Sequence, residues 1–164
     1  MLNFLQGRFM RHPLHPLMVH LPVGLWIGSL VCDIGFLASD SANFAIASYY
    51  MMLLGLIAVL LAVPTGLAEY VSIPANTRPK NIATTHMSLN ILIAVLFLVN
   101  FLMRRGLENG VPSIVTTGQF IFSLITVGIL GFSGYLGGLM VFNYGIGHRR
   151  PELSETENVS RKVA

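Results

Sequence analysis

Four long apolar segments, separated by short polar stretches, make up most of this chain of 164 residues. An almost uncharged segment of about 20 residues is long enough to cross the hydrocarbon core of a bilayer as a helix. The chain is 54% hydrophobic and only 10% charged, a balance that excludes an ordinary soluble domain. We therefore expect an all-α fold, a bundle of four transmembrane helices at about residues 16–38, 42–70, 82–103 and 113–142.

The alternative membrane architecture, a β-barrel, would show short segments of alternating hydrophobicity, and the sequence has none. Residues 15–147 are expected to form one membrane domain without a soluble catalytic module. Residues 1–14 place apolar side chains around Arg8, which favours an interfacial segment lying on the membrane. Residues 148–164 are polar and charged, as is typical of a solvated tail.

The basic residues predict the orientation of the bundle. Only Arg104 and Arg105 fall at one end, and a positive-inside bias then places both termini in the cytoplasm. The charge is divided among separate loops without an aromatic and basic platform, so we expect the lipid bilayer as a partner and no nucleic acid. The basic residues of the other end are Arg8, Arg11, Arg78, Lys80, Arg149, Arg150, Arg161 and Lys162.

All five histidines are predicted to lie at that same cytoplasmic end, because an even number of crossings separates them. Imidazoles bind metals and haem iron, and they change charge near neutral pH, so their clustering is the strongest pointer to function. The opposite end has no histidine, which limits the bundle to a single haem site. The five are His12, His15, His20, His86 and His148.

Small residues predict which helix faces touch, because lipid supplies no hydrophobic drive for helix association. His20 shares a face with Gly24 and Gly28, so we expect it to point into the bundle. His86 would lie about one turn inside the third helix, at a similar depth, if that helix is capped by Asn81 or Thr84. In the fourth helix the corresponding contact face would carry Gly131, Gly134 and Gly138.

A b-type haem between the helices is the sharpest hypothesis. His20 and His86 would be its axial ligands, and Gly24 and Gly28 would leave room for the macrocycle. Arg78 and its basic neighbours would neutralise the propionates. His15 and Tyr144 are the supporting or alternative groups, and the same set of residues could instead form a quinone site.

Other functions receive less support. A simple metal site could use His12, His15, His20, His86 and Glu69, but the segment around His12 offers too few imidazoles for tight binding. An enzyme is not expected, because there is no nucleophile with a neighbouring base, no catalytic carboxylate pair and no phosphate-binding glycine loop. Inward-facing histidines that merely bond to polar neighbours would leave a cofactor-free structural subunit that anchors a larger membrane complex.

Asp33 is the one carboxylate that looks buried, in the outer half of the first helix. An ionised Asp at the bilayer centre costs about 2.5–3.5 kcal/mol on insertion scales. We therefore expect Asp33 to be protonated, paired, or close to the outer interface.

The run from His12 to Trp26, HPLHPLMVHLPVGLW, resembles the opening of a family of predicted bacterial membrane proteins described only as a domain of unknown function. Residues 66–70 and 134–141 extend the resemblance. It implies a four-helix protein of the bacterial inner membrane and, because some members are joined to Rieske-type iron–sulfur domains, membrane redox chemistry. The family tends to carry a histidine before the glycine that is Gly145 here, and this chain has Tyr144 instead.

The sequence thus favours a small redox subunit that binds one b-type haem, or forms a quinone site, beside the cytoplasmic face. Its partners would be other membrane subunits or a docked redox protein. The rival hypothesis is the cofactor-free structural subunit.

Overall fold

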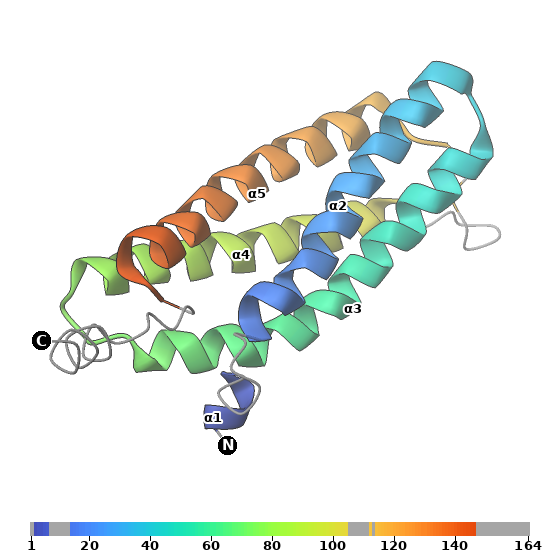
Figure 1. Ribbon diagram of the computed structural model, residues 1–164. Coiled ribbons are helices and arrows are strands. Elements are labelled where there is room, and N and C mark those ends of the chain that lie inside the picture. The colour runs from blue at the N-terminus through green and yellow to red at the C-terminus, as the bar shows by residue number, and fades with distance from the viewer. Residues whose placement is uncertain (1, 7–13, 105–111, 113, 147–164) are drawn as a thin grey trace, which may run out of the picture.

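The structure is a computed structural model that describes residues 2–6, 14–104, 112 and 114–146 (Figure 1). Four of its helices are long and apolar enough to cross a membrane, and the described residues form no strand. The predicted all-α fold with four spans is therefore confirmed. The helices are α1 (Leu2–Leu5), α2 (Leu14–Ser39), α3 (Ala42–Ser72), α4 (Arg78–Met103) and α5 (Thr117–Tyr144).

The start of α4 differs from the expected one. Neither Asn81 nor Thr84 caps this helix; the cap is Thr77, whose hydroxyl accepts a hydrogen bond from the Lys80 amide at 3.3 Å. Pro79 suits the first turn, where its missing N–H costs nothing. As a result His86 lies two turns inside α4 instead of one.

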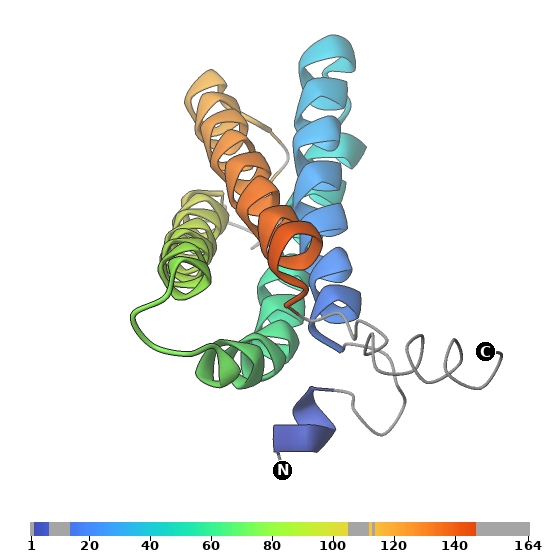
Figure 2. The ribbon, with the colours of Figure 1, turned by 60° about the vertical axis from the view of Figure 1, so that its left-hand side comes forward.

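The spanning helices form two hairpins (Figure 2). α2 packs chiefly on α3, and α4 packs chiefly on α5. α2 and α4 begin at one end of the bundle, where α3 and α5 end (Figure 1). We call this the histidine end. Near it, Gln6, the residue that follows α1, donates from its amide to the Ala68 carbonyl of α3 at 3.0 Å. Residues 1 and 7–13 of the predicted interfacial segment and the predicted tail, 148–164, lie outside the described residues.

α2 and α4 therefore run in the same direction, on opposite sides of the core. Trp26 of α2 stacks on Phe97 of α4, with ring centroids 4.4 Å apart and planes 9° from parallel. A second ring pair, Tyr49 of α3 and Phe101 of α4, stacks at 4.6 Å. These aromatic contacts fill the middle of the bundle and join the two hairpins.

Glycine supplies the close contact beneath the first of these stacks. Gly55 of α3 lies under the Trp26 ring, so a Cβ atom there would come within 3.0 Å of Trp26 Cε2 and closer still to Nε1. Trp26 is 2% exposed, and its Nε1 is the single buried side-chain polar atom without a partner among the described residues. The large indole is accommodated because α3 has no side chain at this point.

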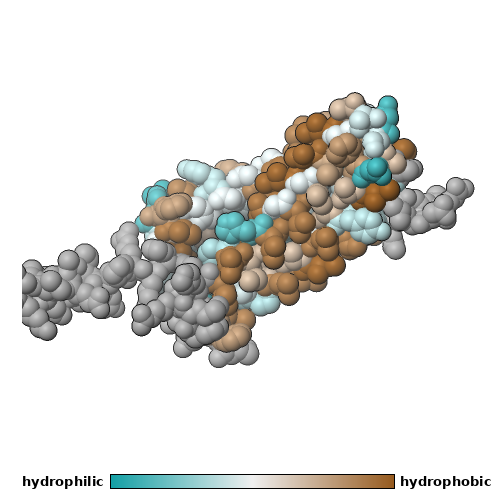
Figure 3. All heavy atoms as spheres, turned by 45° about the vertical axis from the view of Figure 1, so that its right-hand side comes forward, coloured by the Kyte–Doolittle hydropathy of each residue, from teal (hydrophilic) through white to brown (hydrophobic). Residues whose placement is uncertain are grey.

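Three of the glycines that were expected to mark contact faces do not do so. Gly24, Gly131 and Gly134 are exposed, and no described heavy atom lies within 4 Å of a Cβ atom built on any of them. Gly28 does face a neighbour, the Met51 sulfur at 3.0 Å from its added Cβ. Hydrophobic side chains cover most of the face seen in Figure 3, as expected for a surface in contact with lipid.

Replacing Gly55 with Ala should destabilise the bundle, whereas the same change at Gly24 should not. The added methyl group of Gly55→Ala must displace the indole of Trp26, and overpacking of this kind costs about 1–3 kcal/mol. Thermal unfolding of both variants in detergent would show a lower midpoint for Gly55→Ala only. Equal midpoints would mean that Trp26 does not pack on Gly55.

Candidate functional site

At the end of the bundle opposite the histidines, a buried ion pair joins α2 to α4. Arg104 donates from Nη1 to Asp33 Oδ1 at 2.6 Å and from Nη2 to Asp33 Oδ2 at 2.7 Å. Both side chains are 0% exposed. The geometry is the two-pronged pairing that the planar guanidinium favours with a carboxylate.

The other two helices complete this charge pair. Ser48 of α3 donates to Asp33 Oδ1 at 2.6 Å, and Ser123 of α5 donates to Oδ2 at 2.9 Å. Arg104 Nε donates to Asn100 Oδ1 at 3.0 Å. All four spanning helices thus contribute to one network in which both carboxylate oxygens and all three guanidinium nitrogens are hydrogen-bonded. Of the three states expected for Asp33, paired is the one observed.

The polar groups of the histidine end also converge. His86 Nδ1 donates to the Ser133 carbonyl of α5 at 2.8 Å. Its other ring nitrogen, Nε2, accepts from Asn90 Nδ2 at 3.1 Å. Because a carbonyl can only accept, Nδ1 carries a proton; Asn90 Nδ2 shares its two hydrogens among three acceptors, since it also donates to the His86 carbonyl at 2.8 Å and to Ser133 Oγ at 3.0 Å.

His15 of α2 is held by α3 through one of its ring nitrogens. Its Nδ1 lies 3.2 Å from Thr65 Oγ1, and that hydroxyl already donates to the Ala62 carbonyl at 2.7 Å, so Nδ1 is the donor. Nε2 makes no hydrogen bond to the described residues.

The two histidines occupy equivalent places in their hairpins. The His15 ring lies against Gly66 of α3, 2.6 Å from an added Cβ, and the His86 ring lies against Gly137 of α5, 3.3 Å from one. The His86 ring donates directly to the backbone carbonyl of Ser133, one turn earlier on its partner helix, whereas His15 is linked to the corresponding carbonyl of Ala62 through the Thr65 hydroxyl.

Corresponding residues of the two hairpins are separated by the same number of positions in the sequence. The ion pair joins residues separated by 71 positions, and the same separation relates His15 to His86, Trp26 to Phe97 and Gly66 to Gly137. The second hairpin therefore repeats the contacts of the first. Because α2 and α4 run in the same direction and Trp26 stacks on Phe97, each eleven residues after its histidine, His15 and His86 lie at one level of the bundle.

The structure places His20 differently from the expectation. It is exposed, and its Nδ1 bonds to the Pro16 carbonyl of its own helix. The prediction that His20 points into the bundle beside Gly24 and Gly28 is wrong, and His15 is the residue of α2 that lies level with His86. Arg78 is exposed at the first position of α4; His12 and His148 lie outside the described residues.

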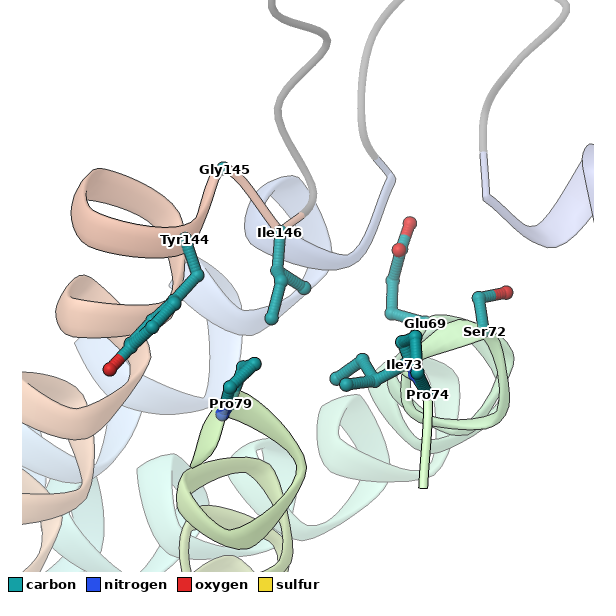
Figure 4. Close-up of a pocket in the computed structure, with 8 residues that line it drawn as sticks. All are labelled: Glu69, Ser72, Ile73, Pro74, Pro79, Tyr144, Gly145 and Ile146. Carbon is teal, nitrogen blue, oxygen red and sulfur yellow. The ribbon is translucent and has the colours of Figure 1, made fainter. Parts of the chain in front are cut away.

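A pocket of about 320 Å³ opens at the histidine end, between the ends of α3 and α5 and the start of α4 (Figure 4). Ile73, Pro79 and Ile146 point toward its centre, while the Tyr144 hydroxyl points away. Tyr144 thus lines the pocket with its ring. The full lining is Glu69, Ser72, Ile73, Pro74, Pro79, Tyr144, Gly145 and Ile146.

The donor set bears on which cofactor could bind. A haem with two histidine ligands needs a free lone pair on each imidazole, and Asn90 Nδ2 lies 3.1 Å from His86 Nε2. Of the level pair His15 and His86, only His15 has a ring nitrogen that makes no hydrogen bond to the described residues. They also contain no group of three or more His, Cys, Asp or Glu side chains that could hold a metal ion.

A signal for the correct histidine was present in the sequence. Asp33 follows His15 by 18 residues, which is five full helical turns, so the two share a face. Arg104 follows His86 by the same interval. His20 lies about 140° from that face, since it precedes Asp33 by 13 residues.

Replacing one partner of the ion pair should lower the free energy of unfolding more than replacing both partners together. Asp33→Leu leaves a buried guanidinium, and Arg104→Met leaves a buried carboxylate; each loss is expected to cost about 3–5 kcal/mol. The double variant should lose much less than the sum. Unfolding free energies of the four proteins form the test, and additive losses would contradict the pairing.

Comparison with known proteins identifies the family of this chain. No curated protein matches it, and no solved structure matches it either. A family model described as "Predicted membrane protein (DUF2231)" matches residues 11–150, which include all four spanning helices. The chain therefore belongs to this family of predicted membrane proteins.

Proposed function

We propose that this protein is a membrane redox subunit that binds a quinone at the histidine end of the bundle. The observation that carries the proposal is the state of His15. Its ring is fixed by α3 through Nδ1, and its Nε2 makes no hydrogen bond to the described residues. A neutral Nε2 accepts a hydrogen bond from a quinol hydroxyl, and a protonated one donates to a quinone carbonyl, so His15 suits both redox states.

A quinone site agrees better with the geometry than a b-type haem does. Hydrogen bonding to a quinone needs one open imidazole, which His15 provides. Binding a haem through two histidines would also require the Asn90 side chain to move away from His86. The Asn90 amide makes a further hydrogen bond to Ser133 Oγ at 3.0 Å. The spectroscopic test described below distinguishes a haem site from a quinone site.

The histidine end is proposed to face the cytoplasm. Arg78 and Lys80 lie at this end, whereas Arg104 at the other end is neutralised by Asp33. The charge that remains exposed on the described part of the bundle therefore favours the positive-inside orientation. Electrons would come from, or pass to, a partner subunit or a docked redox protein.

A cofactor-free structural subunit is the second candidate, and the open glycines favour it. Gly24 on α2 and Gly128, Gly131 and Gly134 on α5 have no described atom within 4 Å of an added Cβ. Small residues on an outward face allow another helix to approach closely. Under this alternative the histidines only join neighbouring helices.

Replacing His15 should weaken quinone binding, and replacing His20 should not. The probe is decylubiquinone, titrated into the protein in lipid nanodiscs and followed by quenching of Trp26, the one tryptophan of the chain. His15→Ala should weaken binding at least tenfold, because it removes the open ring nitrogen. His20→Ala is the matched control, since His20 is exposed and bonded within its own helix.

A reduced-minus-oxidised spectrum of the same preparation separates the alternatives. The absence of quinone binding to a folded protein would contradict the proposal and favour the structural subunit. A Soret band that disappears in His86→Ala would show that the site binds haem and would contradict the proposed quinone site.

A further inference from the structure

The hydroxyl of Thr65 makes the surroundings of His15 different from those of His86. His86 Nδ1 donates directly to the Ser133 carbonyl at 2.8 Å. At the equivalent place in the first hairpin, His15 Nδ1 lies 3.2 Å from Thr65 Oγ1, and this hydroxyl donates to the Ala62 carbonyl at 2.7 Å. A hydroxyl thus faces Nδ1 of one histidine, and a carbonyl faces Nδ1 of the other.

A carbonyl fixes the proton of the imidazole beside it, because a carbonyl oxygen can only accept a hydrogen bond. A lone pair on His86 Nδ1 would face the Ser133 carbonyl oxygen at 2.8 Å, so this nitrogen keeps its proton. The Ser133 hydroxyl also lies 3.1 Å from Nδ1, but it leaves the carbonyl in place. Leu136, which corresponds to Thr65 in the second hairpin, has no hydroxyl to put between ring and backbone. His86 is therefore confined to forms that are protonated at Nδ1.

The Thr65 hydroxyl allows two arrangements of His15, because a hydroxyl both donates and accepts. In the observed arrangement His15 Nδ1 donates to Thr65 Oγ1, and the lone pair of Nε2 can accept a hydrogen bond. If the Thr65 hydrogen rotates toward His15, Nδ1 accepts and the ring proton lies on Nε2. The Ala62 carbonyl is not left unpaired, since in an α-helix it also accepts from the amide four residues later. The ring carries one proton in both arrangements, exchanged with water, so His15 remains neutral.

We infer that Thr65 is a positioning residue that allows His15 to bind both the oxidised and the reduced form of the ligand without becoming charged. The inference rests on the proposed function and adds the group that controls it. A quinol hydroxyl donates to Nε2 while Nδ1 holds the proton, and a quinone carbonyl accepts from Nε2 in the other arrangement. Thr65 is 6% exposed and the His15 ring packs against Gly66, so the hydroxyl is held beside Nδ1. Donation from a charged imidazole would be costly in a membrane.

Thr65→Val removes the hydroxyl with little change of shape and should separate the two redox forms. Nδ1 of His15 then has no donor to accept from, so the arrangement that donates to a quinone carbonyl becomes unfavourable. The Kd for decylubiquinone should rise about tenfold, the effect of one unpaired buried polar group. The Kd for decylubiquinol should change by less than about threefold, because Nδ1 can still donate to the Ala62 carbonyl as His86 does to Ser133.

Two further variants serve as controls, with both Kd values measured in nanodiscs by quenching of Trp26 and with oxygen excluded for the quinol. Thr65→Ser keeps the hydroxyl and should bind both forms as the unaltered protein does. Thr126→Val is the matched control for loss of a buried hydroxyl. Thr126 is 1% exposed, and its hydroxyl donates to the Phe122 carbonyl of its own helix at 2.8 Å.

The ¹⁵N NMR signals of His15 in the unaltered protein support or overturn the inference even if Thr65→Val does not fold. Decylubiquinone should move the ring proton from Nδ1 to Nε2, and decylubiquinol should leave it on Nδ1. If quinone binds and His15→Ala weakens binding, but Nδ1 stays protonated or Thr65→Val affects both forms equally, the role of Thr65 is wrong and the proposed function stands. If the unaltered protein binds neither form, both fail.

Discussion

The ion pair between Asp33 and Arg104 fixes how the two hairpins meet. Hydrocarbon supplies no water to solvate an isolated charge, so each of these side chains must find its partner inside the bundle. Once they meet, α2 and α4 have only one register, in which Trp26 stacks on Phe97. That register also sets the level of the histidines. The arrangement of the candidate site is thus a consequence of an interaction at the far end of the bundle.

The same constraint makes the two ends chemically different. At the ion-pair end every polar atom of the network has a partner, and this part of the core is closed. At the histidine end both ring nitrogens of His86 contact polar groups, only Nδ1 of His15 makes a hydrogen bond to the described residues, and a pocket lies outside them. Polar groups in a membrane core are costly when unpaired, which is why we propose His15 as the residue that meets a ligand.

The sequence was sufficient for the four spans, the end at which His15, His20 and His86 lie, and the need of Asp33 for a partner. It misled where small residues were used to find the inner faces. Gly24 and Gly131 face outward, whereas the glycines that matter, Gly55 and Gly66, are defined by the large rings they accommodate. Spacing alone does not show this. The interval of 18 residues from each histidine to the charge on its helix identifies His15, but the 71-residue register emerges only when the helices are packed.

Nitrogen NMR of histidine side chains in nanodiscs tests the central claim most directly, that α2 and α4 present one open and one fully bonded imidazole at the same level. With ¹⁵N-labelled histidine, and signals assigned by single His→Gln variants, His86 should be a neutral ring protonated at Nδ1. Adding decylubiquinone should shift Nε2 of His15 and leave His20 unchanged. A His20 signal that responds while His15 does not would contradict the account, and so would a His15 Nε2 already hydrogen-bonded without ligand.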